Sequence, residues 1–498
     1  MKKVCQNLAR GNCLGSARRC RLFTPRRAFL VAALMWAGSA ISVAQTGGYR
    51  NGTPGRSPSG SQSNFSGSVP AKAVPGVLSL SLQDAIDLGL KQNLGALLLN
   101  ADIQSARGQR WQQLSALLPH VTAAPYVDAS KTNLSEVGFS FKAPGLTFPT
   151  AVGPFSYFDA RANLTQTLFD WKSISNARAA TQNLKSAEYT YRDARDLVVL
   201  AVGFNYLQAV ADEARIETAD AQVKTAQAIY NQASDQVNAG TSPEIDSLRA
   251  KVELQTRQQQ LIQARNDFAI QKLTVARAIG LAPGQEFDLT DKALYQPFQS
   301  MPVEEALQRA YAARSDYLAA AAEVRAAELS RAAAVAGYFP SLSFSGDLGQ
   351  AGAHPSTSTQ VFDVRGTLSI PIFLGGTVHG DVLQTDARLR QSRELLENLR
   401  GQIDSDVRTA LLNLQSSAEQ VVVARSNIEL AEATLAQSSD RFSAGVTDTV
   451  EVVQSQQAVA SAHEQYISSL YNYNFAKITL ARALGMGEEG VKQFFKGR

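Results

Sequence analysis

The sequence predicts an α + transmembrane β fold that is internally duplicated, with long antiparallel coiled-coil helix hairpins and four β-strands in each chain. Three observations predict it: the chain repeats itself at an offset of about 205 residues, four stretches alternate with a period of two, and the segments between them have a period of seven. Roughly eight strands are needed to close a barrel, so four strands per chain are too few. Three chains would supply the strands of a trimeric 12-stranded barrel.

The duplication is visible in matched segments of the two halves. At offsets of 205 and 204 residues the matches are 239–241 with 444–446, 276–280 with 481–485, and 158–164 with 362–368. The helix that ends at Pro119 matches the one that ends at Pro340 at the larger offset of 221, so the first copy holds 17 extra residues between Pro119 and Phe158. A repeat this long is a duplicated half-molecule and not a solenoid repeat.

The first 44 residues have the pattern of a secretory signal peptide, with a basic front, a short apolar stretch and a small-x-small site before Gln45. A membrane anchor is the alternative, but residues 28–37 fall short of the roughly 20 apolar residues that span a bilayer. The segment contains eight Lys/Arg and all three cysteines, which leaves 40 basic and 44 acidic residues in the exported chain. This balance argues against nucleic-acid binding. Residues 45–77 are rich in Gly, Ser and Pro and are expected to form a flexible tail.

The four period-two stretches are expected to be barrel strands at about 119–131, 157–169, 340–350 and 360–374. Each is near the length of a tilted membrane strand, and charges occur only on the polar face, as expected for a wet lumen and a lipid exterior. Half-buried strands of a soluble sheet are the alternative that alternation alone leaves open. A membrane sheet with bare edges cannot exist in lipid, so these strands require other copies of the chain.

The period-seven stretches predict two long helices, 171–238 and about 378–443, each near 100 Å long at about 1.5 Å per residue. Their apolar residues recur every seven positions and match between the copies: Ile216, Val223, Tyr230 and Val237 with Val421, Ile428, Leu435 and Phe442. A strict heptad predicts a left-handed supercoil. The returning helices are shorter, so helices 303–338 and 82–118 are expected to complete the two hairpins end to end.

The predicted organisation is therefore a circular arrangement of two repeats. The first repeat, 78–302, holds the hairpin 171–280 and an equatorial linker, 281–302, while the second, 303–487, holds the hairpin 378–485. Residues 488–498 form a C-terminal tail. The linker and this tail are expected to form a collar around the middle of the helices.

The chain resembles the TolC family of outer-membrane efflux and secretion channel proteins over roughly residues 80–487. The resemblance depends on residues 368–376 (LSIPIFLGG), similar to the family's strand-exit motif, on their degraded copy 164–170 (LTQTLFD), and on the tip turns 239–246 and 441–448. It implies a homotrimer whose barrel lies in the outer-membrane lipid and whose helical tunnel projects into the periplasm. The hairpin tips would meet a periplasmic adaptor protein and an inner-membrane pump, driven by protons or ATP.

The resemblance also implies a site at the tips. Asp246 and Glu451 lie six residues after their tip glycines, and the family carries acidic residues near here that face the aperture, so these two are the candidate selectivity ring. The alternative is that both are solvated carboxylates in a first helical turn, where they favour the helix dipole. Candidate adaptor-binding residues are Ala239, Gly240, Thr241, Ala444, Gly445 and Val446. Ordinary turn chemistry also explains the glycines.

An enzyme is not expected, because the four histidines are scattered and neither metal-ligand spacing nor a nucleotide-binding motif is visible. No cofactor is expected either. The predicted function is the outer-membrane channel-tunnel of a tripartite efflux or type I secretion system. The alternative is an exported trimeric coiled-coil protein with a structural or adhesive role. The transported substrate cannot be read from these residues.

Overall fold

The computed structural model describes residues 67–73, 75–134, 136, 138, 150–292, 295–298 and 301–495. All of them belong to one compact unit that begins at Arg56. The expected signal peptide (1–44) lies outside the described residues, as do most of the expected tail (45–77) and part of the insertion between the first two predicted strands.

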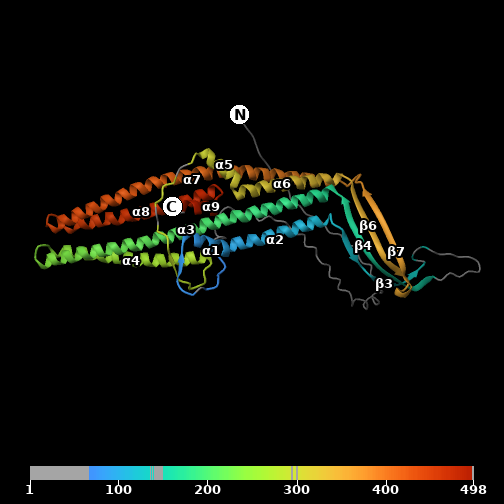
Figure 1. The fold of residues 1–498 in the computed structure, drawn as a ribbon, viewed down its shortest axis with the longest axis horizontal. Coiled ribbons are helices and arrows are strands. Elements are labelled where there is room, and N and C mark those ends of the chain that lie inside the picture. The colour runs from blue at the N-terminus through green and yellow to red at the C-terminus, as the bar shows by residue number, and fades with distance from the viewer. Residues whose placement is uncertain are drawn as a thin grey trace, which may run out of the picture. The chain divides into compact units, whose positions relative to one another are not determined.

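Two long helix hairpins are the largest features of the described chain (Figure 1). They are α3 (Trp171–Asn238, 68 residues) with α4 (Glu244–Ile279), and α7 (Thr377–Ser443, 67 residues) with α8 (Thr449–Ala483). α3 is free of proline, and Asp170 caps its start by accepting hydrogen bonds from the amides of Lys172 and Ser173. α3 and α4 pack along each other, as do α7 and α8, and α3 also contacts α8.

Each of the two shorter helical stretches is broken once, which corrects the expectation of unbroken helices. The four resulting helices are α1 (Leu82–Gln92), α2 (Leu94–Ser115), α5 (Val303–Ala313) and α6 (Ser315–Val335). Asn93 interrupts the first because its side chain accepts from the amides of Gly95 and Ala96 and so starts a new helix in extended backbone conformation. Arg314 has the same extended conformation at the second break and is held there by ion pairs with Asp316 and Asp406.

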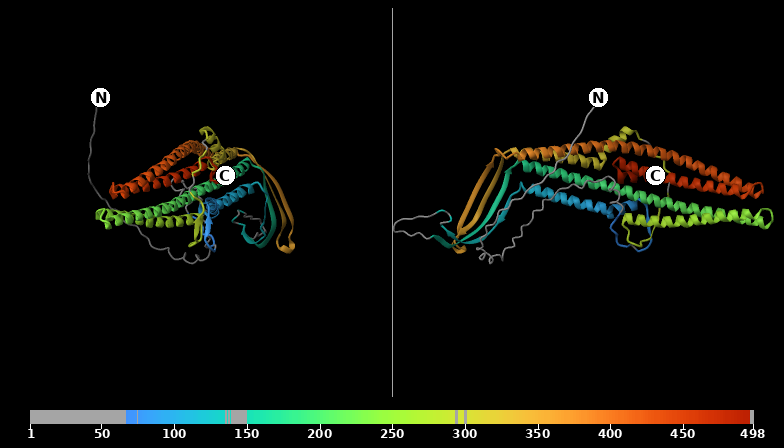
Figure 2. Two further views of the ribbon diagram at one scale, coloured as in Figure 1. Left: turned by 60° about the vertical axis from the view of Figure 1, so that its left-hand side comes forward. Right: turned by 180° about the vertical axis from the view of Figure 1, so that it is seen from behind.

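Helices α2 and α6 run beside the parts of the long helices that lie nearest the sheet (Figure 2). α2 packs against α3, and α6 packs against both α3 and α7. The short returning helices α4 and α8 cover the other part of the long helices, so two short helices in succession accompany each long one.

The sheet is antiparallel, with β4 and β6 in its interior and open edges at β7 and at β2/β3. Its strands are β2 (His120–Ala123), β3 (Tyr126–Asn133), β4 (Ala151–Phe169), β6 (Ser341–Gly352) and β7 (Thr359–Ser369). The first of the four expected strands is divided into β2 and β3, which both pair with β4. The sheet therefore has five strand segments that occupy four strand positions. Pro125 lies in the gap between them, and proline has no amide hydrogen for the ladder.

The strand ends also differ from the expected ones. β4 begins at Ala151 and not near 157, so it takes in part of the inserted residues. β7 ends at Ser369, and the stretch 370–374, expected in a strand, lies outside it and leads to α7. Pro371 explains the stop, because it cannot donate to a ladder. Ile372 and Phe373 in this stretch are 94% and 86% exposed.

The main hydrophobic core lies where the two ends of the chain meet the long helices. β1 (Leu78–Leu80) pairs in parallel with β5 (Phe287–Leu289), and Tyr206 of α3, fully buried, donates a hydrogen bond to the carbonyl of Leu80. The expected C-terminal tail forms a further helix, α9 (Gly487–Phe495), whose Val491 is buried in the same core. Among the described helices α3 alone has an 18-residue stretch apolar enough to cross a membrane, and 56% of it is buried, as in a core helix.

Candidate functional site

The two hairpin tips have the same backbone geometry. Gly240 and Gly445 adopt φ values of 74° and 69°, in the left-handed region that glycine enters without strain. In each turn the glycine amide and the amide after it bond back to the last helical turn, to Val237 and Gln236 in one tip and to Phe442 and Arg441 in the other. This is the Schellman arrangement that ends a helix. The six predicted tip residues, at 239–241 and 444–446, are exposed.

Asp246 lies between the hairpins. Its residue is 5% exposed, and Thr449 at the start of α8 donates a hydrogen bond of 2.7 Å from Oγ1 to its Oδ1. Arg249, one turn further along α4, is 3.7 Å away and half exposed. The carboxylate therefore ties the tip of one hairpin to the tip of the other.

Glu451 occupies the equivalent sequence position but bonds only within its own hairpin. Its carboxylate accepts hydrogen bonds from Arg441 Nη1 at 3.1 Å and from Thr447 Oγ1 at 2.5 Å. The side chain is 37% exposed. The two candidate ring residues thus have different surroundings, one buried between hairpins and one facing solvent beside a tip turn.

A second connection between the hairpins, which the sequence analysis missed, is Arg257 of α4. Its side chain is 2% exposed and binds Glu253 at 2.6 Å on its own helix and Gln457 of α8 at 2.9 Å. It follows Leu254 by three residues, so it occupies a core position of the heptad that is apolar in most coiled coils. The equivalent residue of the second copy is Ala462. A charge at that heptad position, absent from the other copy, is the signal that could have revealed it.

A third connection lies further from the tips. Arg215 of α3 makes a two-pronged contact with Glu464 of α8, with distances of 2.8–3.1 Å, and binds Asp212 at 2.7 Å. Together with Arg257 it borders a groove of about 1090 Å³ between the hairpins. Many of the other lining side chains are glutamine, serine and threonine. The groove offers hydrogen bonds and charge from these side chains, next to apolar surface from residues such as Val423 and Ile467.

The middle of the helices holds a dense ionic cluster where α3, α6, α7 and α8 meet. Arg314, 4% exposed, pairs with Asp316 and Asp406 at 2.7 and 3.1 Å, and Arg482 of α8 pairs with Asp193 of α3. Burial raises the pKa of Asp193. Burial disfavours a charge on Asp316 too, but its bonds with Arg314 hold the pKa of that carboxyl below the usual range.

Asp196 is the most perturbed carboxyl of this region. Burial raises its pKa to about 6, and the neighbouring acids Asp193, Asp316 and Glu488 add to the shift that Arg482 opposes. Lys477 on α8 is another buried charge: burial lowers its pKa to about 8, and its amine donates a hydrogen bond of 2.8 Å to the carbonyl of Gln296. The bond of Lys477 thus fastens α8 to the linker between α4 and α5.

No arrangement suited to catalysis on a bound metal is found in the part of the chain that the structure describes. Within it, no group of three or more His, Cys, Asp or Glu side chains is placed to hold a metal ion. Of the four histidines, His463 contacts Glu432 at 3.2 Å and His354 contacts Ser156 at 3.1 Å, both in exposed positions.

The chain is similar to known outer-membrane proteins in sequence and in fold. A family model described as "Outer membrane efflux protein" matches residues 90–281 and 306–486. The pyoverdine export outer membrane protein OpmQ of Pseudomonas putida is 24% identical over 66% of this chain and 71% of its own length. The alkaline protease secretion protein AprF of Pseudomonas aeruginosa is 25% identical over 66% of this chain and 69% of its own length. The crystal structure of the Campylobacter jejuni CmeC outer membrane channel is similar with a TM-score of 0.70 and 18% identity, covering 83% of this chain and 88% of that one.

Proposed function

The chain belongs to the outer membrane efflux protein family, and from this premise we propose that it is the channel-tunnel component of a tripartite efflux or type I secretion system. As a member of that family it is an outer-membrane channel protein of efflux and secretion systems and not an enzyme. The predictions of the family, the α + transmembrane β fold and the outer-membrane location are confirmed.

The observation that carries the proposal is the sheet with two open edges and one apolar, exposed face. On that face Phe362, Val364 and Leu348 are 74%, 67% and 55% exposed, which suits contact with lipid. A sheet edge in a bilayer leaves amide and carbonyl groups unpaired at a cost of several kcal/mol each. We propose that β7 of one chain pairs with β2 and β3 of the next, and that three chains close the barrel.

In such a trimer the hairpins of the three chains surround a tunnel that ends at the tips. We propose that Glu451 and Asp246 supply the charge at that end. The half-exposed carboxylate of Glu451 is available to solutes in the described conformation. Asp246 would join the ring only when it leaves Thr449, that is, when the two hairpins separate. Rings of carboxylates bias a pore toward cations.

The exposed tip residues are the proposed docking points for a periplasmic adaptor. Ala239, Gly240, Ala444 and Gly445 have small side chains or none, so the helices of a partner can approach the backbone closely. The inner-membrane pump would then deliver substrate to the tunnel. One relative is named for pyoverdine export and another for protease secretion, and both kinds of cargo remain compatible with this chain.

The test is conductance of the purified protein. Detergent-solubilised trimer added to a planar bilayer should produce discrete current steps, whereas an exported structural or adhesive coiled coil would produce none. Tip docking is tested separately with single cysteines at Gly240 and Gly445, because all three native cysteines lie in the expected signal peptide. Each should cross-link to the adaptor in cells, and cysteines in the middle of α4 should not.

A further inference from the structure

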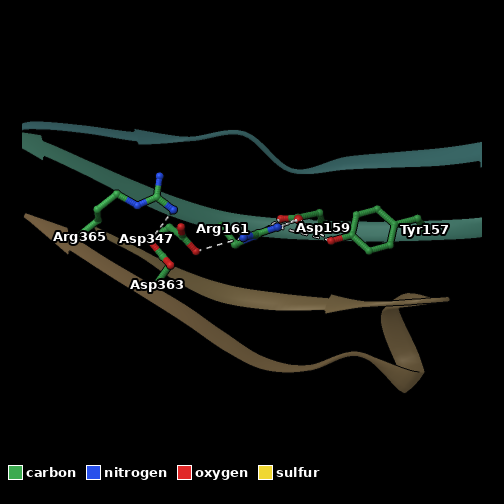
Figure 3. A network of polar contacts seen from close by, with 6 residues as sticks. All are labelled: Tyr157, Asp159, Arg161, Asp347, Asp363 and Arg365. Atoms are coloured by element: carbon green, nitrogen blue, oxygen red, sulfur yellow. Dashed lines mark hydrogen bonds and ion pairs between the residues drawn. The ribbon is translucent and has the colours of Figure 1, made fainter. Parts of the chain in front are cut away.

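The polar face of the sheet carries a network of charged side chains, far along the chain from the acids at the hairpin tips (Figure 3). We call Tyr157, Asp159, Arg161, Asp347, Asp363 and Arg365 the charged belt. The register places them on one face: Asp347 of β6 is directly opposite both Asn163 of β4 and Asp363 of β7, and directly opposed residues point to the same side. The other face is the apolar one, so in a membrane barrel the charged belt lines the lumen.

The belt is a product of the duplication. Asp159 and Arg161 on β4 match Asp363 and Arg365 on β7 at an offset of 204, so each chain carries two copies of an Asp-x-Arg unit. If the two halves occupy equivalent places around the pore, a three-chain barrel holds six such units around its lumen. Asp347 lies between the two units of a chain, and at the offset of 221 it matches the uncharged Tyr126, so its charge is not duplicated.

The contacts show which charges a passing solute would meet. Arg161 binds Asp159 through Nε at 2.9 Å and Asp347 through Nη1 at 3.2 Å, while Tyr157 donates a 2.9 Å hydrogen bond to Asp159. Asp159 is only 3% exposed beneath these groups. Gly349 is directly opposite Arg161, and a Cβ there would lie 2.8 Å from the Cγ of Arg161, so the glycine lets the arginine lie against the wall.

The second unit is more open. The side chains of Asp363 and Arg365 are 52% and 69% exposed and 3.6 Å apart. The belt therefore consists of three carboxylates and two guanidinium groups in each chain, a net charge of −1. Asp128 of β3, directly opposite Tyr157, adds a further carboxylate to the same face. The four charges of the two Asp-x-Arg units cancel in pairs.

We propose that this belt is a second charge-selective element of the channel, located in the barrel lumen and separate from the acids at the hairpin tips. The proposal rests on the proposed trimeric channel. Because the net charge on this face is small and negative, the belt favours cations weakly, and single substitutions raise or lower that preference. At a distance of about 8 Å in water one elementary charge changes the local concentration of a monovalent ion roughly twofold.

The test measures the permeability ratio of K⁺ to Cl⁻ from reversal potentials of the trimer in planar bilayers. Arg365→Gln, which removes an exposed arginine, should raise the ratio about twofold. Asp347→Asn, which leaves both Asp-x-Arg units intact, should lower it about twofold. Arg161→Gln is not used, because it would leave Asp159 buried without its partner.

The direction of the salt gradient distinguishes the belt from the tips. The Debye length is about 30 Å at 0.01 M salt and about 10 Å at 0.1 M, so a fixed charge acts most strongly when the dilute solution bathes its own end of the pore. The Arg365→Gln and Asp347→Asn effects should be larger with dilute salt on the barrel side, and those of Glu451→Gln larger with dilute salt on the tip side. Unchanged ratios in both belt variants of a conducting trimer overturn the belt alone, whereas a wild-type trimer that does not conduct overturns the proposed function.

Discussion

The hydrogen bond between Thr449 and Asp246 gives the sharpest test of how the hairpins are held together. Thr449→Val keeps the shape of the side chain and removes the hydroxyl that donates 2.7 Å to the carboxylate. Thr449 is fully buried and Asp246 is 5% exposed, so water does not readily replace the lost donor. A hydrogen bond to a charged group contributes about 1.5–3 kcal/mol.

The bond joins α4 to α8, so it stabilises the state in which the hairpins touch and is absent when they separate. Its loss should therefore shift the equilibrium toward separated tips by roughly 10- to 100-fold, since 1.4 kcal/mol corresponds to a factor of ten. The assay is single-channel recording in planar bilayers at constant voltage and salt. Thr449→Val should increase the time spent in higher-conductance states.

Thr447→Val is the matched control. Thr447 donates to Glu451 with a similar geometry, at 2.5 Å, but both residues belong to the same hairpin. The same chemical change there should leave the opening behaviour close to that of the wild type. Equal effects of the two variants, or no effect of Thr449→Val, would refute the assignment of Thr449 and Asp246 as a tie between hairpins.

Three further predictions concern the buried and exposed charges. Arg257→Met leaves the carboxylate of Glu253, which is 13% exposed, without its cation, and should destabilise the helical part by about 3–5 kcal/mol in thermal unfolding. Adding Glu253→Gln should recover much of the lost stability. A double variant as unstable as the single one would contradict this reasoning. The pKa of Asp196 is raised to about 6 in the folded protein, so the folded state binds this proton more tightly than the unfolded chain, and stability is lost as the pH rises through 6. Asp196→Asn should therefore stabilise the protein by roughly 2 kcal/mol at pH 7.5 and hardly at all at pH 4, and equal effects at both pH values would be inconsistent with that shift. Glu451→Gln should lower the cation preference in bilayers, and an unchanged ion selectivity would remove Glu451 from the proposed ring.

Much of the fold could be predicted because it follows from periodic patterns. Alternation along β4 and β7 and heptads along the hairpins are repeated in both copies, so the sheet rows, the long helices and the tip turns could be located from the sequence. The breaks at Asn93 and Pro125 were missed, although asparagine often begins a helix and proline often interrupts a strand. A single asparagine in an otherwise helical pattern is usually solvated, and only the fold shows that this one caps a new helix.

The site shows the limits of the duplication as a guide. Asp246 and Glu451 are equivalent by sequence, but one faces the neighbouring hairpin and the other a tip turn of its own. No local pattern distinguishes them, because the partner Thr449 is 203 residues from Asp246 in the chain. The same is true of Arg257 and Gln457, which are 200 residues apart. Contacts between the two copies depend on how the copies pack, and the internal repeat does not determine that.

The central claim is that three chains close one barrel by pairing β7 of each chain with β2 and β3 of the next. Cysteine pairs that combine one position on Thr359–Ser369 with one on Tyr126–Asn133 test it directly, since the residues after the expected signal peptide contain no other cysteine. Scanning such pairs in intact outer membranes should yield, at the correct register, a covalent ladder on denaturing gels that stops at three chains. A ladder that stops at two, continues beyond three, or fails to form at any register would contradict the account.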